Sequence, residues 1–232
     1  SAKYSLIYKK IIGIHSKGNN MKYKHIVFDI DGTLIDTEKA VLKSLQVTLK
    51  EYQNRVVAID ELRFALGIPG EITLQKLGIP DIKEANTTWN KYMSEFAHTI
   101  AVFDGIERVL SDLRSSGFEL GIISSKTHKE YKADFSPFAL EKYFGTVICF
   151  EDSVTPKPTA APMLAYLKQT GANSDEVIYI GDTIYDMQCA KNAGVDFGLA
   201  LWGCHSDAIQ ANCYFKSPTE ILDLSVDRIE FN

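Results

Sequence analysis

The segment HIVFDIDGTLIDT, residues 25–37, organises the rest of the chain. Its apolar run Ile26–Phe28 predicts a buried parallel strand, and this strand ends in two aspartates one residue apart, Asp29 and Asp31. Carboxylates are costly at the end of a buried strand unless a cation or hydrogen bonds compensate them. We therefore expect a compensating group beside these two acids.

The two residues after Asp31 suit a turn that binds phosphate. Gly32 lets the backbone turn sharply, and Thr33 supplies a hydroxyl and a backbone N–H. Hard cations prefer oxygen ligands, and α/β proteins bind ligands at the carboxyl ends of parallel strands. The segment predicts a binding site for a hard cation and a phosphoryl group. The alternative is a polar turn that only ends a strand.

Length and composition indicate an ordinary globular protein. The 232 residues are 45% hydrophobic and 24% charged, enough for one large domain or a core with a smaller insert. The net charge of −5 disfavours a nucleic-acid partner. The sequence contains no run of eighteen apolar residues, so we expect no membrane-spanning helix. Four cysteines without metal-ligand spacing favour a reducing, cytoplasmic setting: Cys149, Cys189, Cys204 and Cys213.

The first twenty residues differ from the rest. Residues 4–14 are apolar, but Lys9-Lys10 makes this stretch too short and too broken for a secretory signal. A loop-like stretch follows, and then Met21. We expect residues 1–20 to be a leader or a cloning remnant and Met21 to be the functional start.

Helical periodicity dominates the chain between Thr37 and Phe103. Apolar residues such as Val41 and Leu45 recur at three- and four-residue steps, and nothing in this region resembles a strand. We therefore expect residues 37–103 to form a helical cap, inserted into a core made of residues 21–36 and 104–232.

Strands and helices alternate in the second half of the chain. The pattern predicts strands at 118–123, 146–150, 177–180 and 197–201, with helices at 158–169 and 186–192. Such alternation requires right-handed crossovers. The predicted fold class is therefore α/β: a Rossmann-like parallel sheet with helices on both faces, in three layers, plus the helical cap.

Polar residues follow the predicted strands where each strand ends. Ser124 follows the strand that ends at Ile123, and Asp182 follows the strand that ends at Ile180. In the common nucleotide-binding strand order the first strand lies between these two, which brings Asp29, Ser124 and Asp182 to one crevice. This convergence supports a site more strongly than any one motif.

Charge suggests what these residues do. Asp29 and Asp182 would give anionic oxygens to Mg²⁺, and Asp186, four residues on, would orient a metal-bound water or pair with a lysine. Ser124, with the N–H of Ser125 at an expected helix start, would bind phosphate oxygens.

Lys157 is the expected fixed positive charge. It lies between Pro156 and Pro158, which restrict the backbone around it. A lysine here would offset the repulsion between Asp29 and an incoming phosphate. Taken alone, Lys157 would be an exposed loop lysine.

These residues together resemble the four motifs of the haloacid dehalogenase-like hydrolase superfamily, whose members are mostly magnesium-dependent phosphatases. Asp29 and Asp31 match the first motif, Ser124 the second, Lys157 the third and residues 181–186 the fourth, in this order. The helical insert is similar to the small cap of that family. Within the family, the chain is most similar to phosphoglycolate phosphatase-like members, including through residues 199–203, LALWG.

The resemblance implies a mechanism. Asp29 would attack phosphorus to form an aspartyl-phosphate, and Asp31 would protonate the leaving group and then deprotonate the attacking water. The backbone carbonyl of Asp31 would join Asp29 and Asp182 as a Mg²⁺ ligand. The implied partner is a small phosphorylated metabolite, and the implied assembly is a monomer or homodimer. The residues expected to bind or support substrate are Gly32, Thr33, Ser124, Ser125 and Lys157, with Thr183 and Asp186 behind them.

Several rival functions share the motifs. A metal-free dehalogenase has little use for Asp31, and a phosphonate hydrolase usually lacks this second aspartate and needs a cap lysine. Phosphosugar mutases carry a histidine about a dozen residues after the nucleophile, where this chain has Val41. A mutase and a non-catalytic regulatory member remain the alternatives. The sequence leaves the physiological substrate open, since Arg55, Arg63, Lys76, His98 and residues 67–70 of the cap are more often surface residues than contacts.

Overall fold

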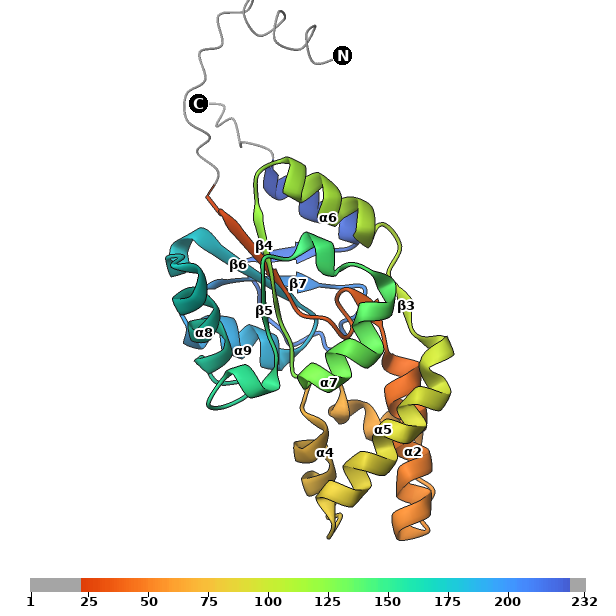
Figure 1. The fold of residues 1–232 in the computed structure, drawn as a ribbon. Coiled ribbons are helices and arrows are strands. Elements are labelled where there is room, and N and C mark those ends of the chain that lie inside the picture. The colour runs from red at the N-terminus through yellow and green to blue at the C-terminus, as the bar shows by residue number, and fades with distance from the viewer. Residues whose placement is uncertain (1–21, 226–232) are drawn as a thin grey trace, which may run out of the picture.

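The computed structural model describes residues 22–225 (Figure 1). The predictions for residues 1–20 and Met21 lie outside the described residues. The centre is a parallel sheet with the strand order β5-β4-β1-β6-β7-β8. Its strands are β1 (His25–Phe28), β4 (Glu119–Ile123), β5 (Thr146–Ile148), β6 (Val177–Gly181), β7 (Asp196–Ala200) and β8 (Cys213–Phe215).

The predicted strand order is confirmed, because β1 lies between β4 and β6. Phe28, the last residue of β1, pairs with Ile122 of β4 on one side and Ile180 of β6 on the other. The carboxyl ends of these three strands are therefore level. The loops that follow them leave the sheet at the same edge.

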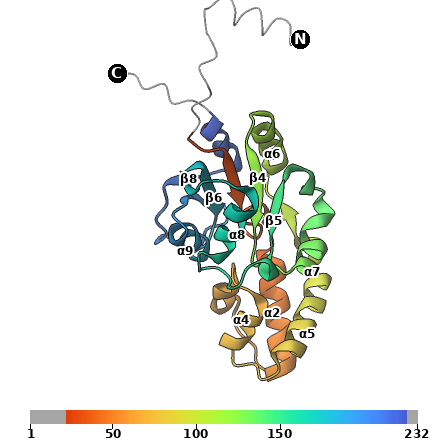
Figure 2. The same ribbon diagram turned by 60° about the vertical axis from the view of Figure 1, so that its left-hand side comes forward.

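Helices cover both faces of the sheet, as Figures 1 and 2 show. Side chains alternate along β1, so Ile26 and Phe28 join one buried cluster while Val27 joins another. The first cluster includes α6 (Ile106–Ser115), and the second includes α8 (Ala161–Thr170) and α9 (Ile184–Asn192). This separation confirms the predicted three-layer α/β fold.

A group of helices lies beyond the carboxyl edge of the sheet (Figures 1 and 2). It contains α2 (Glu38–Gln53), α3 (Ile59–Leu62), α4 (Gly70–Lys76) and α5 (Ile82–Phe96). The long helices α2 and α5 pack together, and the indole N–H of Trp89 donates to the Ser44 hydroxyl at 2.8 Å across their interface. The described helices include none with the length and apolar character required to cross a membrane.

The prediction that no strand occurs between Thr37 and Phe103 is wrong. Strand β3 (Ala101–Val102) pairs antiparallel with β2 (Ile35–Asp36), with Ile35 opposite Val102. Two residues are too few to show a strand period in the sequence. This ribbon carries the chain out to the helices and back, so it joins the two parts at both crossings.

Candidate active site

The site lies at the carboxyl ends of the three central strands. The backbone N–H of Asp29 donates to the Ile180 carbonyl at 2.8 Å, and the N–H of Ser124 donates to the Ile148 carbonyl at 2.9 Å. These bonds extend the sheet ladders by one residue, so the sheet fixes the backbone of both Asp29 and Ser124. Asp29, Asp182 and Asp186 bring carboxylate oxygens within 4.8 Å of one another.

Asp29 is buried, and only one of its two carboxylate oxygens has a hydrogen-bond partner. The residue is 2% exposed, and its Oδ1 accepts a hydrogen bond from Lys157 Nζ at 2.8 Å. Its Oδ2 is one of two buried side-chain polar atoms in residues 22–225 that have no hydrogen-bond partner. Burial raises the pKa of Asp29 to about 7, although Lys157 opposes this rise. A free, buried carboxylate oxygen is the group that a cation or an electrophile would complete.

Lys157 is 3% exposed and lies on the same rim as Asp29, as expected from its motif rather than from its loop context. Its ammonium also donates to Asp186 Oδ1 at 2.6 Å and to the Tyr179 hydroxyl at 3.2 Å. Burial lowers the pKa of Lys157, but Asp186 and Asp29 outweigh burial and raise it above its ordinary value. Lys157 is therefore a fixed cation at the base of the site.

Asp186 and Thr183 form a supporting layer beneath this cation. Asp186 Oδ1 also accepts from the Tyr179 hydroxyl at 2.9 Å, and Oδ2 accepts from the N–H and hydroxyl of Thr183 at 3.0 and 2.6 Å. Thr183 is the N-cap of α9. Both oxygens of Asp186 thus have donors, so of the three clustered acids Asp29 and Asp182 are the ones able to hold a metal ion.

Thr33 is turned toward an acid of the site. It is fully buried, its hydroxyl donates to Asp182 Oδ1 at 3.0 Å, and its N–H donates to the Ile30 carbonyl at 3.2 Å. Burial, together with the charges of Asp186 and Asp29, raises the pKa of Asp182 well above its usual range. The protein's own groups therefore compensate this acid only in part, and oxygen ligands of this kind fit Mg²⁺.

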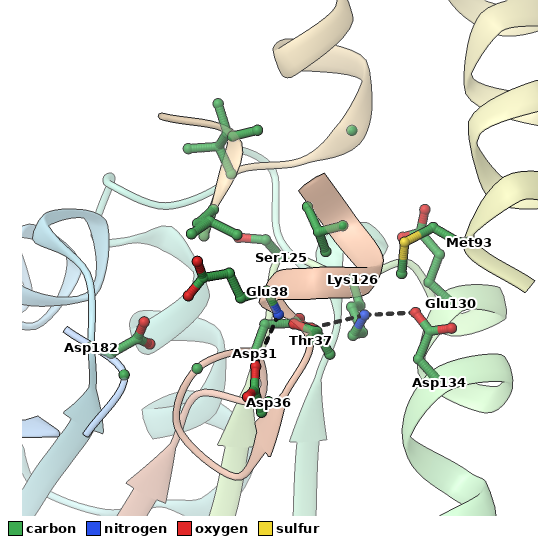
Figure 3. A pocket seen from close by; sticks show the side chains of 18 of the residues that line it. Asp31, Asp36, Thr37, Glu38, Met93, Ser125, Lys126, Glu130, Asp134 and Asp182 are labelled. Carbon is green, nitrogen blue, oxygen red and sulfur yellow. Dashed lines mark hydrogen bonds and ion pairs between the residues drawn. The ribbon is translucent and has the colours of Figure 1, made fainter. Parts of the chain in front are cut away.

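Asp31 is held from the side by a second ion-pair network, drawn in Figure 3. Its Oδ1 accepts from the Thr37 hydroxyl at 2.7 Å and lies 3.1 Å from Lys126 Nζ. Lys126 is itself buried and donates to Asp134 at 2.7 Å. Burial lowers the pKa of Lys126, and Asp31 and Asp134 more than reverse this, so the lysine stays charged.

Sequence reasoning missed Lys126, Asp134 and Tyr179 as site residues. Lys126 follows Ser124 by two residues, and this spacing was the one available signal. Asp134 and Tyr179 had none, because an acid in a helical region and an aromatic residue in a strand are common in any α/β protein. Their roles depend on contacts between segments distant in the sequence.

The expected helix start at Ser125 is wrong. Helix α7 (His128–Glu130) begins three residues later, and the Thr127 hydroxyl caps it by accepting from the Glu130 N–H at 3.2 Å. Ser125 instead donates from its hydroxyl to the Gly67 carbonyl at 3.1 Å. Ser124 is buried and accepts from the Lys126 N–H at 3.2 Å. Ser125 therefore joins the core to the helical part of the chain.

Two glycines allow the loop after β1 to lie close to Asp182 on one side and to the Trp202 loop on the other. Gly32 has a φ of +78°, and a Cβ there would lie 2.2 Å from Asp182 Oδ2. A Cβ on Gly203 would lie 1.8 Å from the Gly32 carbonyl oxygen. The Trp202 indole N–H donates to the Thr33 carbonyl at 3.0 Å. The loop after β7 therefore supports the loop after β1 from behind, a role the sequence did not reveal.

Gly203→Ala is expected to displace this loop and to lower activity by more than about tenfold, since an ångström-scale shift of catalytic groups has effects of that size or larger. Gly145→Ala is the matched control, because a Cβ there meets nothing closer than 3.7 Å. Steady-state kinetics of both variants decide the matter. Equal, near-normal activity of the two would show that the loop contact is dispensable.

A pocket opens above these groups, between the core and the helices (Figure 3). Asp31, Gly32, Ser125, Lys126 and Asp182 line it from the core. Residues from the other side include Val41, Gly67, Asn86, Trp89, Asn90 and Met93. A ligand bound at the acids would thus contact the helical part of the chain.

Acids, a buried lysine and a serine thus gather at the carboxyl edge of a Rossmann-like parallel sheet, which is where α/β enzymes of this architecture bind their ligands. A family model described as haloacid dehalogenase-like hydrolase matches residues 26–200, more than half of the chain. The chain therefore belongs to the haloacid dehalogenase-like hydrolase family, and the predictions of this family and of a hydrolase are confirmed.

Relatives and solved structures agree with this assignment. The chain is 27% identical to a putative pyrophosphatase PpaX of Caldanaerobacter subterraneus over 183 residues, which cover 78% of this chain and 83% of the relative. It is 28% identical to a phosphoglycolate phosphatase of Aquifex aeolicus over 205 residues, covering 88% and 92%. The crystal structure of a putative phosphoglycolate phosphatase from Lactobacillus plantarum has a TM-score of 0.81 at 26% identity, covering 88% and 100%. The predicted similarity to phosphoglycolate phosphatases is confirmed.

Proposed function

We propose that the protein is a Mg²⁺-dependent phosphatase that hydrolyses small phosphate monoesters through an aspartyl-phosphate on Asp29. One observation carries this proposal: Asp29 has a buried, unpartnered Oδ2 beside a fixed lysine and within 4.8 Å of Asp182. The family and the names of relatives, which include phosphatases and pyrophosphatases, support the same reaction class.

Asp29 is the nucleophile in this proposal. A carboxylate oxygen of Asp29 attacks phosphorus, the bond from phosphorus to the leaving oxygen breaks, and water then cleaves the aspartyl-phosphate. Lys157 holds Oδ1 at 2.8 Å and so fixes the direction of Oδ2. Its positive charge also offsets the repulsion between carboxylate and phosphate.

Asp31 is the general acid and base. It lines the pocket, and its Oδ1 is occupied by Thr37 and Lys126, so Oδ2 is the oxygen left for proton transfer. It donates a proton to the departing alkoxide and removes one from the water that attacks next. Lys126 and Thr37 act by holding the carboxylate in place.

The metal ion would be held by Asp29, Asp182 and the backbone carbonyl of Asp31. When bound, Mg²⁺ supplies positive charge that stabilises the transferring phosphoryl group. Thr33 positions Asp182 from below. The Gly32 N–H already donates to the Ile35 carbonyl at 2.8 Å, so the Ser124 hydroxyl and the Ser125 N–H are left to bind phosphate oxygens.

The helices α2 to α5 act as the cap, residues 37–103, over a core of residues 21–36 and 104–232. Support comes from the two-strand connection at β2 and β3 and from the pocket that both parts line. We propose further that the enzyme works in the cytoplasm on small metabolites, as a monomer or homodimer. Buried, unbridged thiols at Cys149 and Cys189 agree with a reducing compartment.

The test of this function is turnover of p-nitrophenyl phosphate and of a panel of metabolite phosphates, each with Mg²⁺ and with a chelator. We expect hydrolysis that requires Mg²⁺. Absence of turnover across the whole panel with Mg²⁺ present would contradict a phosphatase and favour a non-catalytic member of the family.

Mg²⁺ is also expected to stabilise the protein without any substrate. An ion at 100 times its Kd adds about 2.7 kcal/mol to the free energy of unfolding. For a chain of this size that raises Tm by about 5 °C or more, measured by thermal unfolding. Asp182→Asn should lose this shift, whereas Asp175→Asn, at an exposed acid, should keep it. Equal shifts in the two variants would place the metal elsewhere.

A further inference from the structure

The pocket above Asp31 has an excess of negative charge. Its lining includes six carboxylates but only one lysine and no arginine. The carboxylates are Asp31, Asp36, Glu38, Glu130, Asp134 and Asp182. In the proposed mechanism Lys157 and the metal ion balance the phosphoryl group itself. The other residues of the lining therefore determine the electrostatic potential at the leaving group.

The basic side chains near the leaving group already contact carboxylates. Lys126 lies between Asp31 and Asp134, at 3.1 and 2.7 Å. His205 Nε2 lies 2.8 Å from Glu38 Oε2, and the other oxygen of Glu38 pairs with Arg63, which does not line the pocket. Within residues 22–225, every basic side chain of the lining is thus already in contact with a carboxylate. A second anion on the substrate would find no unpaired cation there.

The remaining acids are occupied as well. Glu130 Oε2 accepts from the Thr127 N–H at 2.8 Å, and Asp36 Oδ1 accepts from the Glu38 N–H at 3.1 Å. These bonds leave the acids in place as a source of negative potential. A substrate carboxylate or second phosphate would therefore be repelled without a compensating contact.

Two neutral groups in the pocket have no partner. Asn86 and Asn90 lie one turn apart on α5, are half-buried and line the pocket. Their side-chain amides make no hydrogen bond to any residue in the described part of the chain. Each amide can both donate and accept, as an alcohol hydroxyl can. Trp89, between them, has its N–H bound to Ser44 and offers an apolar wall.

We propose that this site selects phosphate monoesters of neutral polyhydroxy alcohols, with Asn86 and Asn90 binding the hydroxyls, and rejects anionic leaving groups. The inference rests on the proposed phosphatase function and narrows its substrate class. It separates this chain from relatives named for phosphoglycolate or pyrophosphate, both of which carry a second anion beside the reacting phosphate.

Three probes that differ only at the far end test this selection: glycerol 1-phosphate, 3-phosphoglycerate and 3-amino-2-hydroxypropyl phosphate, with pyrophosphate as a fourth. We expect kcat/KM for glycerol 1-phosphate to exceed that for 3-phosphoglycerate and for pyrophosphate by about tenfold or more, the size of one unbalanced charge contact. The amino compound should not exceed glycerol 1-phosphate by as much as tenfold, because its ammonium must be desolvated and the lining acids already accept hydrogen bonds, which offsets its attraction to their negative potential.

A lysine introduced at the pocket should change the selection. Asn90→Lys adds one positive charge to the lining and removes one amide, so the ratio of kcat/KM for 3-phosphoglycerate to that for glycerol 1-phosphate should rise by about tenfold. Thr87→Lys is the matched control: it makes the same charge change on the same helix at an exposed residue outside the lining, and should leave the ratio unchanged.

The outcomes are distinct. Turnover of 3-phosphoglycerate or pyrophosphate as fast as glycerol 1-phosphate overturns the selection and leaves the phosphatase proposal intact. A tenfold preference for the amino compound also overturns it and shows that the acids attract a cation. Hydrolysis of p-nitrophenyl phosphate without hydrolysis of glycerol 1-phosphate also overturns the proposed selection. Absence of all turnover ends both proposals. The comparison of the four probes with the wild-type enzyme tests the proposed selection even if Asn90→Lys does not fold.

Discussion

Asp29→Asn is expected to lower kcat/KM for phosphate monoesters by about 10⁴-fold or more, because loss of a nucleophile removes the reaction path itself. An amide keeps the shape of the side chain, and its carbonyl oxygen still accepts the hydrogen bond from Lys157. The change also removes a buried charge whose Oδ2 has no partner. The folded state should therefore be as stable as the wild type to within about 1 kcal/mol.

Kinetics and thermal unfolding of the same preparation measure both expectations. Asp175→Asn, an exposed acid on the far side of β6, is the control and should keep normal activity. An Asp29→Asn enzyme that kept a tenth of the wild-type activity would refute the nucleophile assignment. A variant that was inactive because it unfolded would be recognised by its Tm.

Lys157→Met is expected to lose both activity and stability. It leaves Asp29 and Asp186 buried without the cation that each contacts, at 2.8 and 2.6 Å. Breaking a buried ion pair by removing one partner costs about 3–5 kcal/mol. For a protein of this size such a loss lowers Tm by about 10 °C. Lys168→Met, at an exposed lysine of α8, should change neither property.

A double variant separates loss of charge balance from loss of packing. If the instability of Lys157→Met comes from uncompensated acids, adding Asp29→Asn should restore part of the lost free energy of unfolding, because one of the two buried charges is then gone. Activity should stay absent. If Asp29→Asn instead destabilises Lys157→Met further, the destabilisation lies in side-chain packing and Lys157 is not an electrostatic centre.

The sequence was sufficient for the arrangement of the core. Apolar runs that end in polar residues identify buried parallel strands, and crossover handedness restricts the sheet to few orders. The position of Asp29 beside Asp182 follows from this topology alone. Lys157 needed the further information of its motif, because its loop context predicts an exposed residue.

Other parts of the site depend on contacts that the sequence does not encode locally. The Lys126 and Asp134 ion pair and the loop contact between Gly203 and Gly32 join segments brought together by packing. The β2 and β3 ribbon is too short to show a period, and the bend at Ser125 replaces an expected helix start. Local sequence pattern thus located the catalytic groups. Tertiary packing determined which residues position them.

The most direct test of Asp29 as the covalent centre is to trap the acyl phosphate. Enzyme quenched during turnover of a phosphate monoester and treated with borohydride should contain homoserine at position 29, identified by peptide mass spectrometry, and enzyme without substrate should contain none. Homoserine at another aspartate, or at no residue while hydrolysis proceeds, would contradict the account.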